Sequence, residues 1–430
     1  MTTNTERAEC TIKIARDLKK VPHPTIPRTF ILKERIVVGP AGSNTQAGVS
    51  ADKGITDAFA PTRIGFMSDV PHLTSGLASY LDPVILALED AINEGRLKRS
   101  VEIFASHVMG LPTGQPQDVI AAYLDLVAKG CVLILSAGVT DNSLVLQDTI
   151  NATKVPFITM AGTTRFVGPH CFSLANGGHG EETAIMAAYL ADQGFKRVVV
   201  TGERSPGDSE YHLFFQEQAR LYGVDILKEH YFDQRPGEDE IDEALRHFRD
   251  DLKPDALVYC GFGWSSFVFN AALERIGWQP PKIMNTAIMW ALGGGELAKA
   301  LDGWIGIEQS LEEEEGLPMN PNYVPMLDRF EARFGYRPRT TMTALCYDEG
   351  RVAVEAIVNC PLLTGEGMSK GIERIKMMPS TLGGPRTYIA FGPEDHRGYK
   401  GDFLFLKQLR DQKFHFVAYH NPQWKINRES

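Results

Sequence analysis

The sequence lacks several features that would each point to a particular class of protein. No apolar run approaches the roughly 18 to 20 residues that a membrane-spanning helix requires. Basic residues are in the minority, with 44 Lys and Arg against 54 Asp and Glu, which gives a formal net charge of −10. A nucleic-acid partner is not expected, because binding phosphates depends on a cationic surface that releases counterions. We therefore expect a soluble protein without direct membrane insertion.

The first 30 residues also lack the apolar stretch of about 7 to 15 residues that a secretory signal contains. Charged residues recur through this region instead. Residues 5–20 have the apolar periodicity of a short amphipathic helix that ends before Pro22. As it stands, the sequence predicts a cytoplasmic location. A periplasmic location is the alternative if a leader has been removed.

Cysteine is scarce, and its spacing excludes the common metal and redox motifs. No C-x-x-C pair occurs, so neither a zinc site nor a disulfide framework is expected. His170 and His179, nine residues apart around a glycine-rich loop, are expected to be surface residues rather than metal ligands. We expect reduced and mostly buried thiols at the six cysteine positions, which are Cys10, Cys131, Cys171, Cys260, Cys346 and Cys360.

Motifs of catalysis and cofactor binding are also missing. The one dense glycine cluster, at 293–295, does not fit G-x-G-x-x-G, and neither a Walker motif nor a G-x-S-x-G elbow occurs. No paired carboxylates and no set of nucleophile and base stand out. The sequence therefore predicts no catalytic residue, no cofactor and no metal, and it favours a protein that is not an enzyme.

From residue 60 onward, short apolar runs alternate with helical stretches, as expected for parallel strands buried on both faces of a sheet. One series spans about 63–160 and a second about 181–285. Two series predict two sheets, because a single open sheet with so many strands would be unusual. The expected fold class is α/β, with two doubly wound, Rossmann-like lobes. The expected strands are 63–67, 101–105, 132–135, 157–160, 197–201, 224–231, 256–260 and 282–285. Among the expected helices are 210–222, 265–276 and 323–334.

Small and polar residues gather where these strands end, which is where the ligand crevice of a doubly wound sheet lies. Small residues let a ligand approach backbone N–H groups and helix N-termini, which favour carboxylate or carbonyl oxygens. Each position alone could simply cap a helix, but one cluster per strand in both series predicts a cleft. The candidate ligand-binding residues are Asp69, His72, Ser136, Ala137, Gly138, Gly162, Thr163, Thr164, Glu203, Phe262, Trp264 and Ala287.

Short sequence patterns also follow one another along residues 60–420 in an order that is typical of one protein family. They are Ala91-Ile92-Asn93, Leu135-Ser136-Ala137-Gly138, Val155-Pro156-Phe157-Ile158 before Gly162-Thr163-Thr164, Cys346-Tyr347-Asp348, and Asp395-His396-Arg397-Gly398 before a closing pair of strands. In this order the chain resembles the leucine/isoleucine/valine-binding family of type I periplasmic binding proteins. The family also includes a cytoplasmic branch of amide sensors.

The resemblance implies two lobes joined by three crossovers, near 172–178, 303–311 and 386–396, with a ligand held between the lobes. It divides the chain into three parts, with residues 1–60 as an additional N-terminal arm outside the fold. The first lobe comprises 61–172 and 311–385, and the second comprises 173–310 and 386–430.

The resemblance also implies roles for particular residues. Ser136 and Gly138 match the strand end that holds a ligand carboxylate, and the loop at 162–164 matches a second such site. Phe262 and Trp264 fall where the family places an aromatic residue from the second lobe.

The acidic residue with which amino-acid binders pair the ligand ammonium is missing from 285–288, where Ala287 lies. An unpaired ammonium in a closed cleft would cost several kcal/mol. A small carboxylate, an amide or an aromatic acid therefore fits better than an α-amino acid. Asp69 or Glu203 could still supply a charge from another direction.

Three functions follow in order of preference. The first is a non-catalytic receptor that feeds a small organic ligand to the permease of an ABC importer. The second is a cytoplasmic sensor on the same scaffold, which passes lobe closure to a regulatory partner and uses the arm for partner or homodimer contacts. The third is an enzyme on a doubly wound fold, in which Asp69, His72 or Glu203 would be required for turnover.

Overall fold

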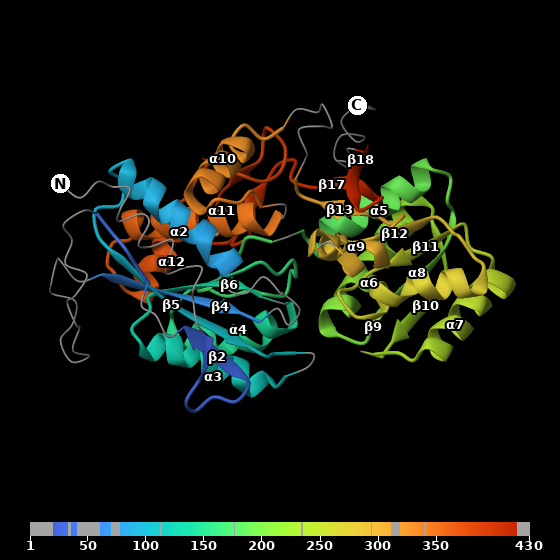
Figure 1. Ribbon diagram of the computed structural model, residues 1–430, viewed down its shortest axis with the longest axis horizontal. Helices are drawn as coiled ribbons and strands as arrows, with labels where there is room; N and C mark the ends of the chain where they lie inside the picture. The colour runs from blue at the N-terminus through green and yellow to red at the C-terminus, as the bar shows by residue number, and fades with distance from the viewer. Residues whose placement is uncertain are drawn as a thin grey trace.

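The computed structural model shows two α/β lobes side by side, each built on its own sheet (Figure 1). The C-terminal third returns to both lobes, since its orange helices lie with the blue N-terminal elements and its last two strands, labelled β17 and β18, lie with the green and yellow elements. This arrangement is the type I periplasmic binding protein fold, as the sequence predicted. The described residues are 20–32, 36–40, 61–69, 78–111, 114–138, 140–175, 177–233, 235–293, 295–310, 319–338 and 341–418.

The first sheet has the strand order β1-β2-β5-β4-β6-β7-β8, with β3 also paired to β5. From β5 to β8 all pairs are parallel, with Met67 opposite Ser136 and Ser136 opposite Thr159. The polar residues Ser136 and Thr159 of neighbouring strands therefore meet at the carboxyl end of the sheet. The strands are β1 Lys20–Pro22, β2 Thr29–Leu32, β3 Ile36–Val38, β4 Thr62–Ser68, β5 Val101–Val108, β6 Leu133–Ala137, β7 Phe157–Thr159 and β8 Cys171–Ser173.

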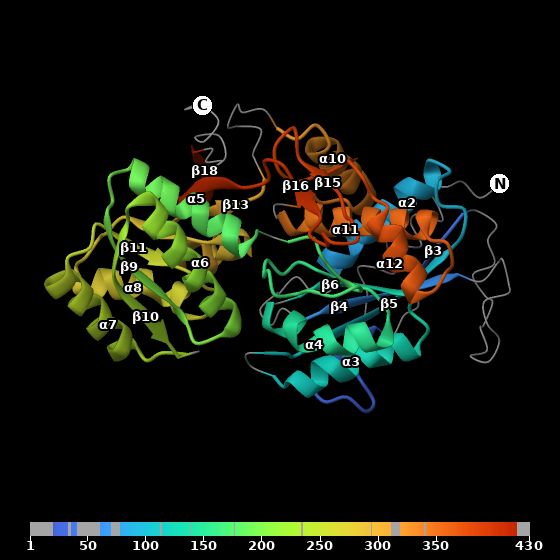
Figure 2. The same ribbon diagram turned by 180° about the vertical axis from the view of Figure 1, so that it is seen from behind.

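Helices cover both faces of this sheet, because successive side chains of a strand point to opposite faces. Ile64 and Phe66 pack in one apolar cluster with α2, α10, α11 and α12, and Met67 packs in another with α3 and α4. Figure 2 shows these two helical layers above and below the sheet. The helices are α2 Ala78–Asn93, α3 Pro116–Ala128, α4 Thr140–Thr153, α10 Tyr323–Phe334, α11 Thr341–Asn359 and α12 Gly365–Glu373.

Part of the predicted N-terminal arm belongs to the first lobe. Thr29–Leu32 and Ile36–Val38 run antiparallel along β5, and Ile36 and Val38 lie in the core cluster with α2. The expectation of an arm outside the fold is therefore wrong for these residues. Their backbone pairing with β5 covers the sheet edge that β5 would otherwise expose. The amphipathic helix predicted at 5–20 lies almost entirely outside the described residues.

The second sheet has the order β10-β9-β11-β12-β13-β17-β18, parallel as far as β13 and antiparallel beyond it. Val198 and Val200 pack with α5 and α6, and Val199 packs with α7, α8 and α9 on the other face. The strands are β9 Arg197–Glu203, β10 Asp225–Phe232, β11 Ala256–Tyr259, β12 Lys282–Met284, β13 Ile305–Glu308, β17 Phe405–Arg410 and β18 Lys413–Ala418. The helices are α5 His179–Asp192, α6 Pro206–Tyr222, α7 Glu238–His247 with a π-helical turn η1 Phe248–Leu252, α8 Ser265–Ile276, the 3-10 helix η2 Thr286–Gly293 and α9 Gly295–Ala300.

The chain passes between the lobes after β8, after β13 and after a small third sheet. That sheet consists of β14 Met378–Pro379, β15 Tyr388–Ile389 and β16 Tyr399–Lys400. Ile389 and Tyr399 lie in the first-lobe core, so the crossover predicted near 386–396 occurs only after Lys400. We propose that the final segment of the second lobe begins there. No helix among the described residues is both long and apolar enough to cross a membrane.

Candidate functional site

The predicted residues lie at the carboxyl ends of strands in both lobes. In the first lobe Asp69 follows β4, Ser136–Gly138 close β6 and Gly162–Thr164 follow β7. In the second lobe Glu203 ends β9, Phe262 and Trp264 follow β11, and Ala287 lies in η2. His72 lies outside the described residues, and only the backbone of Ala137 is described.

Three polar side chains of the first lobe converge on Gly138. A Cβ atom at Gly138 would stand 2.6 Å from Oγ of Ser136, 3.5 Å from Oδ1 of Asp69 and 3.6 Å from Oγ of Ser143. The other Asp69 oxygen accepts a hydrogen bond of 2.6 Å from Nδ2 of Asn142, a residue that the sequence argument missed. Ser136 is buried, and its hydroxyl has no hydrogen-bond partner among the described residues. A buried hydroxyl without a hydrogen bond costs folding free energy unless a ligand or a water molecule bonds to it.

The loop after β7 binds a carboxylate that belongs to the protein itself. Thr164 donates to Oε1 of Glu210 from its backbone N–H at 2.9 Å and from its hydroxyl at 2.6 Å. The hydroxyl of Thr163 donates to Oε2, and Nδ1 of His179 lies 3.0 Å from the same oxygen. Burial alone would raise the pKa of Glu210, but the hydrogen bonds from His179, Thr163 and Thr164 outweigh burial and lower that pKa to about 2.

Glu210 comes from α6, so this contact joins the two lobes. The sequence argument placed the start of the helix at Glu210, which would have left the carboxylate at the helix end. The helix instead begins at Pro206, with the hydroxyl of Ser205 accepting from the N–H of Asp208 at 3.0 Å. Ser followed by Pro is a helix-start signal that was present in the sequence. With the earlier start, Glu210 lies one turn inside the helix.

Glu203 is buried and supports the loop after β11. Its oxygens accept hydrogen bonds from the Tyr259 hydroxyl at 2.7 Å, the backbone N–H of Ser265 at 2.8 Å and the Ser265 hydroxyl. A Cβ atom at Gly263 would stand 1.9 Å from Cδ of Glu203, so the loop passes over the carboxylate only because this residue is glycine. Asp208 lies beside it, and burial together with the Glu203 charge raises the pKa of Asp208 well above its usual value. Both Glu203 oxygens are thus engaged within the second lobe.

The aromatic residues of the second lobe form a larger group than the sequence indicated. The Trp264 ring is 41% exposed and stands edge-on to Phe267, with ring centres 5.6 Å apart. Phe267 in turn stands edge-on to Trp290 at 6.5 Å. Nε1 of Trp290 is buried and has no hydrogen-bond partner within the described part of the chain. Phe262 packs against both core clusters of the lobe, so Trp264 presents the more accessible ring.

Ala287 is fully buried in the second-lobe core, and an acidic residue reaches the same strand end from another element. Glu182 in α5 accepts hydrogen bonds of 2.7 Å from the N–H and from the hydroxyl of Thr286, and one of 2.9 Å from the Tyr211 hydroxyl. Burial raises the pKa of Glu182 to about 8, although these hydrogen bonds oppose the shift. The segment 285–288 therefore lacks an acid in sequence but not in space.

The two histidines expected at the surface are buried. His179 is 1% exposed and stacks on Tyr211, and Nδ1 of His170 lies 2.7 Å from Oγ of Ser369. The expectation failed because each ring has a polar partner that is distant in sequence. The described residues contain no group of three or more His, Cys, Asp or Glu side chains that could hold a metal. Free thiols are found at Cys131, Cys171, Cys260 and Cys346, which are buried, and at Cys360, which is half-buried. Cys10 lies outside the described residues.

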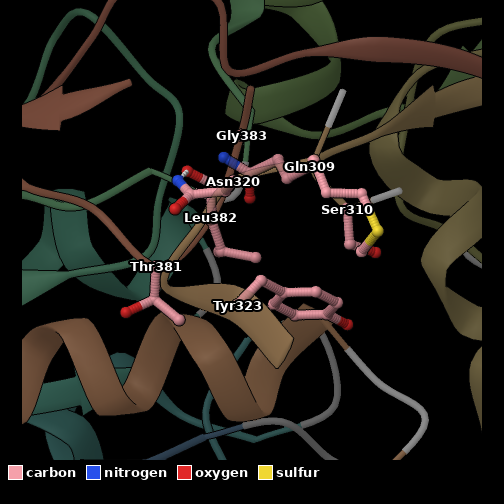
Figure 3. A pocket seen from close by; sticks show the side chains of 8 residues that line it. Gln309, Ser310, Asn320, Tyr323, Thr381, Leu382 and Gly383 are labelled. Atoms are coloured by element: carbon pink, nitrogen blue, oxygen red, sulfur yellow. Dashed lines mark hydrogen bonds between the residues drawn. The ribbon is translucent and has the colours of Figure 1, made fainter. Parts of the chain in front are cut away.

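A small depression lies at the crossovers rather than at the strand ends (Figure 3). Its empty space of about 160 Å³ is open to solvent. Asn320, which lines it, donates hydrogen bonds to Oγ of Ser380 at 3.1 Å and to the Leu382 carbonyl at 2.9 Å. Gln309 at the same place accepts from Gly383 at 2.9 Å and donates to Ala175 at 3.1 Å, so the depression belongs to the joint between the lobes.

Comparison with known families supports this architecture. The sequence profile of a family described as periplasmic binding protein matches residues 112–410, more than half of the chain. The chain belongs to the periplasmic binding protein family. The matched residues lie within the range 60–420 over which the sequence resembles the leucine/isoleucine/valine-binding branch. No curated protein matches the chain at a significant level.

Solved structures of the periplasmic binding protein family share the fold. An ABC transporter substrate-binding protein from Desulfitobacterium hafniense, in complex with leucine, is 15% identical, with a TM-score of 0.68 over 83% of this chain and 100% of that chain. A leucine-binding protein from Thermotoga maritima is 17% identical, with a TM-score of 0.67 over 84% and 99%. A type 1 periplasmic binding protein from Bordetella pertussis is 18% identical, with a TM-score of 0.69 over 84% and 100%. At such identities the likeness shows the fold alone.

Proposed function

We propose that this member of the periplasmic binding protein family is a non-catalytic receptor that holds a small organic ligand between its lobes. The observation that carries the proposal is the meeting of the two lobes through polar strand-end groups. Glu210 of the second lobe is bound by Thr163 and Thr164 of the first, and Asp141 of the first accepts from Gly207 of the second. A ligand that bridges the same faces would favour the closed arrangement by its differential affinity for it.

The ligand class that fits best is a small carboxylate, an amide or an aromatic acid. The loop at 163–164 supplies hydroxyl and N–H donors to a carboxylate, and the Ser136 hydroxyl, which has no partner in the described part of the chain, supplies a further polar contact. Trp264 and Trp290 offer an aromatic wall, and the indole N–H of Trp290 has no hydrogen-bond partner among the residues that the structure describes. The buried acids of the second lobe that we describe are already engaged by protein donors, which disfavours a ligand ammonium.

A transport role is the preferred setting, with the permease of an ABC importer as partner. Among the structural neighbours, the protein from Desulfitobacterium hafniense is described as the substrate-binding protein of an ABC transporter. The second candidate is a ligand sensor that acts on a regulatory partner or as a homodimer. Light scattering with and without ligand tests the homodimer form of this hypothesis, which predicts a change in mass on ligand binding.

Thermal-shift screening tests the receptor proposal. A ligand at 100 times its Kd stabilises the folded state by about 2.7 kcal/mol, which is readily measured. We expect shifts from small carboxylates, amides or aromatic acids and none from leucine, isoleucine or valine. A clear leucine shift would overturn the ligand class. Turnover of a bound compound would overturn the non-catalytic role and revive the enzyme hypothesis.

A further inference from the structure

The contact between Glu210 and the loop at 163–164 has the form of a ligand site with its ligand in place. Both carboxylate oxygens are engaged, one by the N–H and hydroxyl of Thr164 and the other by the Thr163 hydroxyl and the His179 ring. The Glu210 side chain is 5% exposed, so the carboxylate has left water for these donors. Charge-assisted bonds of this kind are about twice as strong as neutral ones.

We infer that Glu210 is the internal occupant of the carboxylate site that the family resemblance places at the Thr163–Thr164 loop, and that it holds the lobes together until the carboxylate of a ligand replaces it. The inference rests on the proposed function and deepens it, because it says which group of the protein fills that site when no ligand is bound. It also assigns to Glu210 a role that the strand-end pattern did not contain.

Occupation by Glu210 and by a ligand carboxylate is mutually exclusive. The loop has a single set of donors, and two carboxylates that share it would repel each other out of water. The apparent affinity for a ligand is therefore reduced by the fraction of molecules in which Glu210 fills the site. The loop is reachable from solvent, since Thr164 is exposed although Thr163 and Glu210 are buried. A small anion can thus reach the donors once the side chain is removed.

Chemical rescue of Glu210→Ala by acetate tests the inference on the full chain. The variant should show a lower melting temperature and a larger radius of gyration in solution scattering than the wild type. Sodium acetate should raise its melting temperature by about 2 °C or more and restore the compact radius, whereas acetamide, which is neutral, should not. Glu217→Ala, which removes an exposed carboxylate from the same helix, is the matched control and should respond to neither.

Further variants keep the result decisive if Glu210→Ala does not fold. Glu210→Gln preserves the shape of the side chain but not its charge, and it should bind acetate about fivefold or more tightly than the wild type. Adding Thr163→Val should abolish both the acetate rescue and this gain. An acetate response equal to that of Glu217→Ala, or carboxylate affinities unchanged by Glu210→Gln, would overturn the inference.

The outcomes also separate this inference from the proposed function. If acetate rescues Glu210→Ala but screening finds no ligand for the wild type, the role of Glu210 as internal occupant would be supported and the receptor proposal would not. A ligand whose affinity is the same in the wild type and in Glu210→Gln would support the receptor and overturn the internal occupant.

Discussion

Asp141, at the start of α4 in the first lobe, accepts a hydrogen bond of 2.9 Å from the backbone N–H of Gly207 in the first turn of α6 in the second lobe. The donor is an N–H that the helix itself leaves unpaired. Burial raises the pKa of Asp141, while the hydrogen bond from Gly207 opposes the shift. The hydrogen bond between the lobes therefore depends on the Asp141 carboxylate, whose charged form is disfavoured by burial.

Replacing Asp141 by alanine should favour opening of the lobes. The loss of one hydrogen bond worth about 1 kcal/mol lowers the ratio of closed to open molecules about fivefold. Fluorescence energy transfer between a label on each lobe measures the ratio. Asp141→Asn keeps the acceptor oxygen and is the control. Equal transfer in Asp141→Ala and the wild type would show that the contact does not bias closure.

Ser136→Ala should weaken ligand binding without destabilising the fold. The Ser136 hydroxyl is buried and without a partner among the described residues, so its removal leaves no donor or acceptor stranded. We expect the free energy of unfolding to stay within about 0.5 kcal/mol of the wild type and the Kd to rise about tenfold. Urea titration and calorimetry measure the two quantities. Ser209→Ala, at an exposed position, should change neither. An unchanged Kd would place the site elsewhere.

Two tryptophans of the second lobe should respond in opposite ways. Trp264 is 41% exposed, so Trp264→Ala should lower ligand affinity with a change in stability of about 1 kcal/mol or less. Trp304 is fully buried, stacks on Phe269 and donates from Nε1 to Asn270 at 3.1 Å. Trp304→Ala should therefore cost about 3 to 5 kcal/mol. Denaturant unfolding with and without ligand separates the effects, and a folded Trp264→Ala protein with wild-type affinity would exclude the aromatic wall.

Glu182→Gln should change how stability depends on pH. The folded-state pKa of Glu182 is raised to about 8, so the folded protein holds this proton more tightly than the unfolded chain. Protonated Glu182 contributes fully to the free energy of unfolding below the unfolded-state pKa of about 4.3, and this contribution is lost as pH rises towards 8. Glutamine keeps the shape of the side chain but does not titrate. Between pH 5 and 8 the free energy of unfolding of the variant should therefore rise relative to that of the wild type by about 1 kcal/mol or more.

Urea unfolding of the Glu182→Gln protein at several pH values checks this expectation. Glu217→Gln, on an exposed surface of α6, is the control and should run parallel to the wild type. If the stability of Glu182→Gln also followed the same pH dependence as the wild type, titration of Glu182 would not contribute to the pH dependence of stability.

The positions of the longer elements could be predicted because their pattern is local. Residues 323–334 and 265–276 were expected as helices and are found as α10 and α8 with these bounds. The expected strands at 63–67 and 197–201 correspond to β4 and β9. The strand β8 and the 3-10 helix η2 were missed, although β7 and β12, which are as short as β8, were predicted.

Within the candidate site, the sequence by itself determined that small and polar residues end the strands of two sheets, since a strand and the turn after it are written in consecutive residues. Only the tertiary structure decided which of these groups are already paired. Glu210 lies 46 residues from Thr164, and Glu182 lies 104 residues from Thr286. No local pattern encodes contacts across such sequence separations, because the first depends on how the two lobes pack and the second on how α5 packs against η2 within the second lobe. Hence the order of the residues predicts where a ligand binds, and the fold shows that the Glu210 carboxylate accepts hydrogen bonds from the Thr163–Thr164 loop.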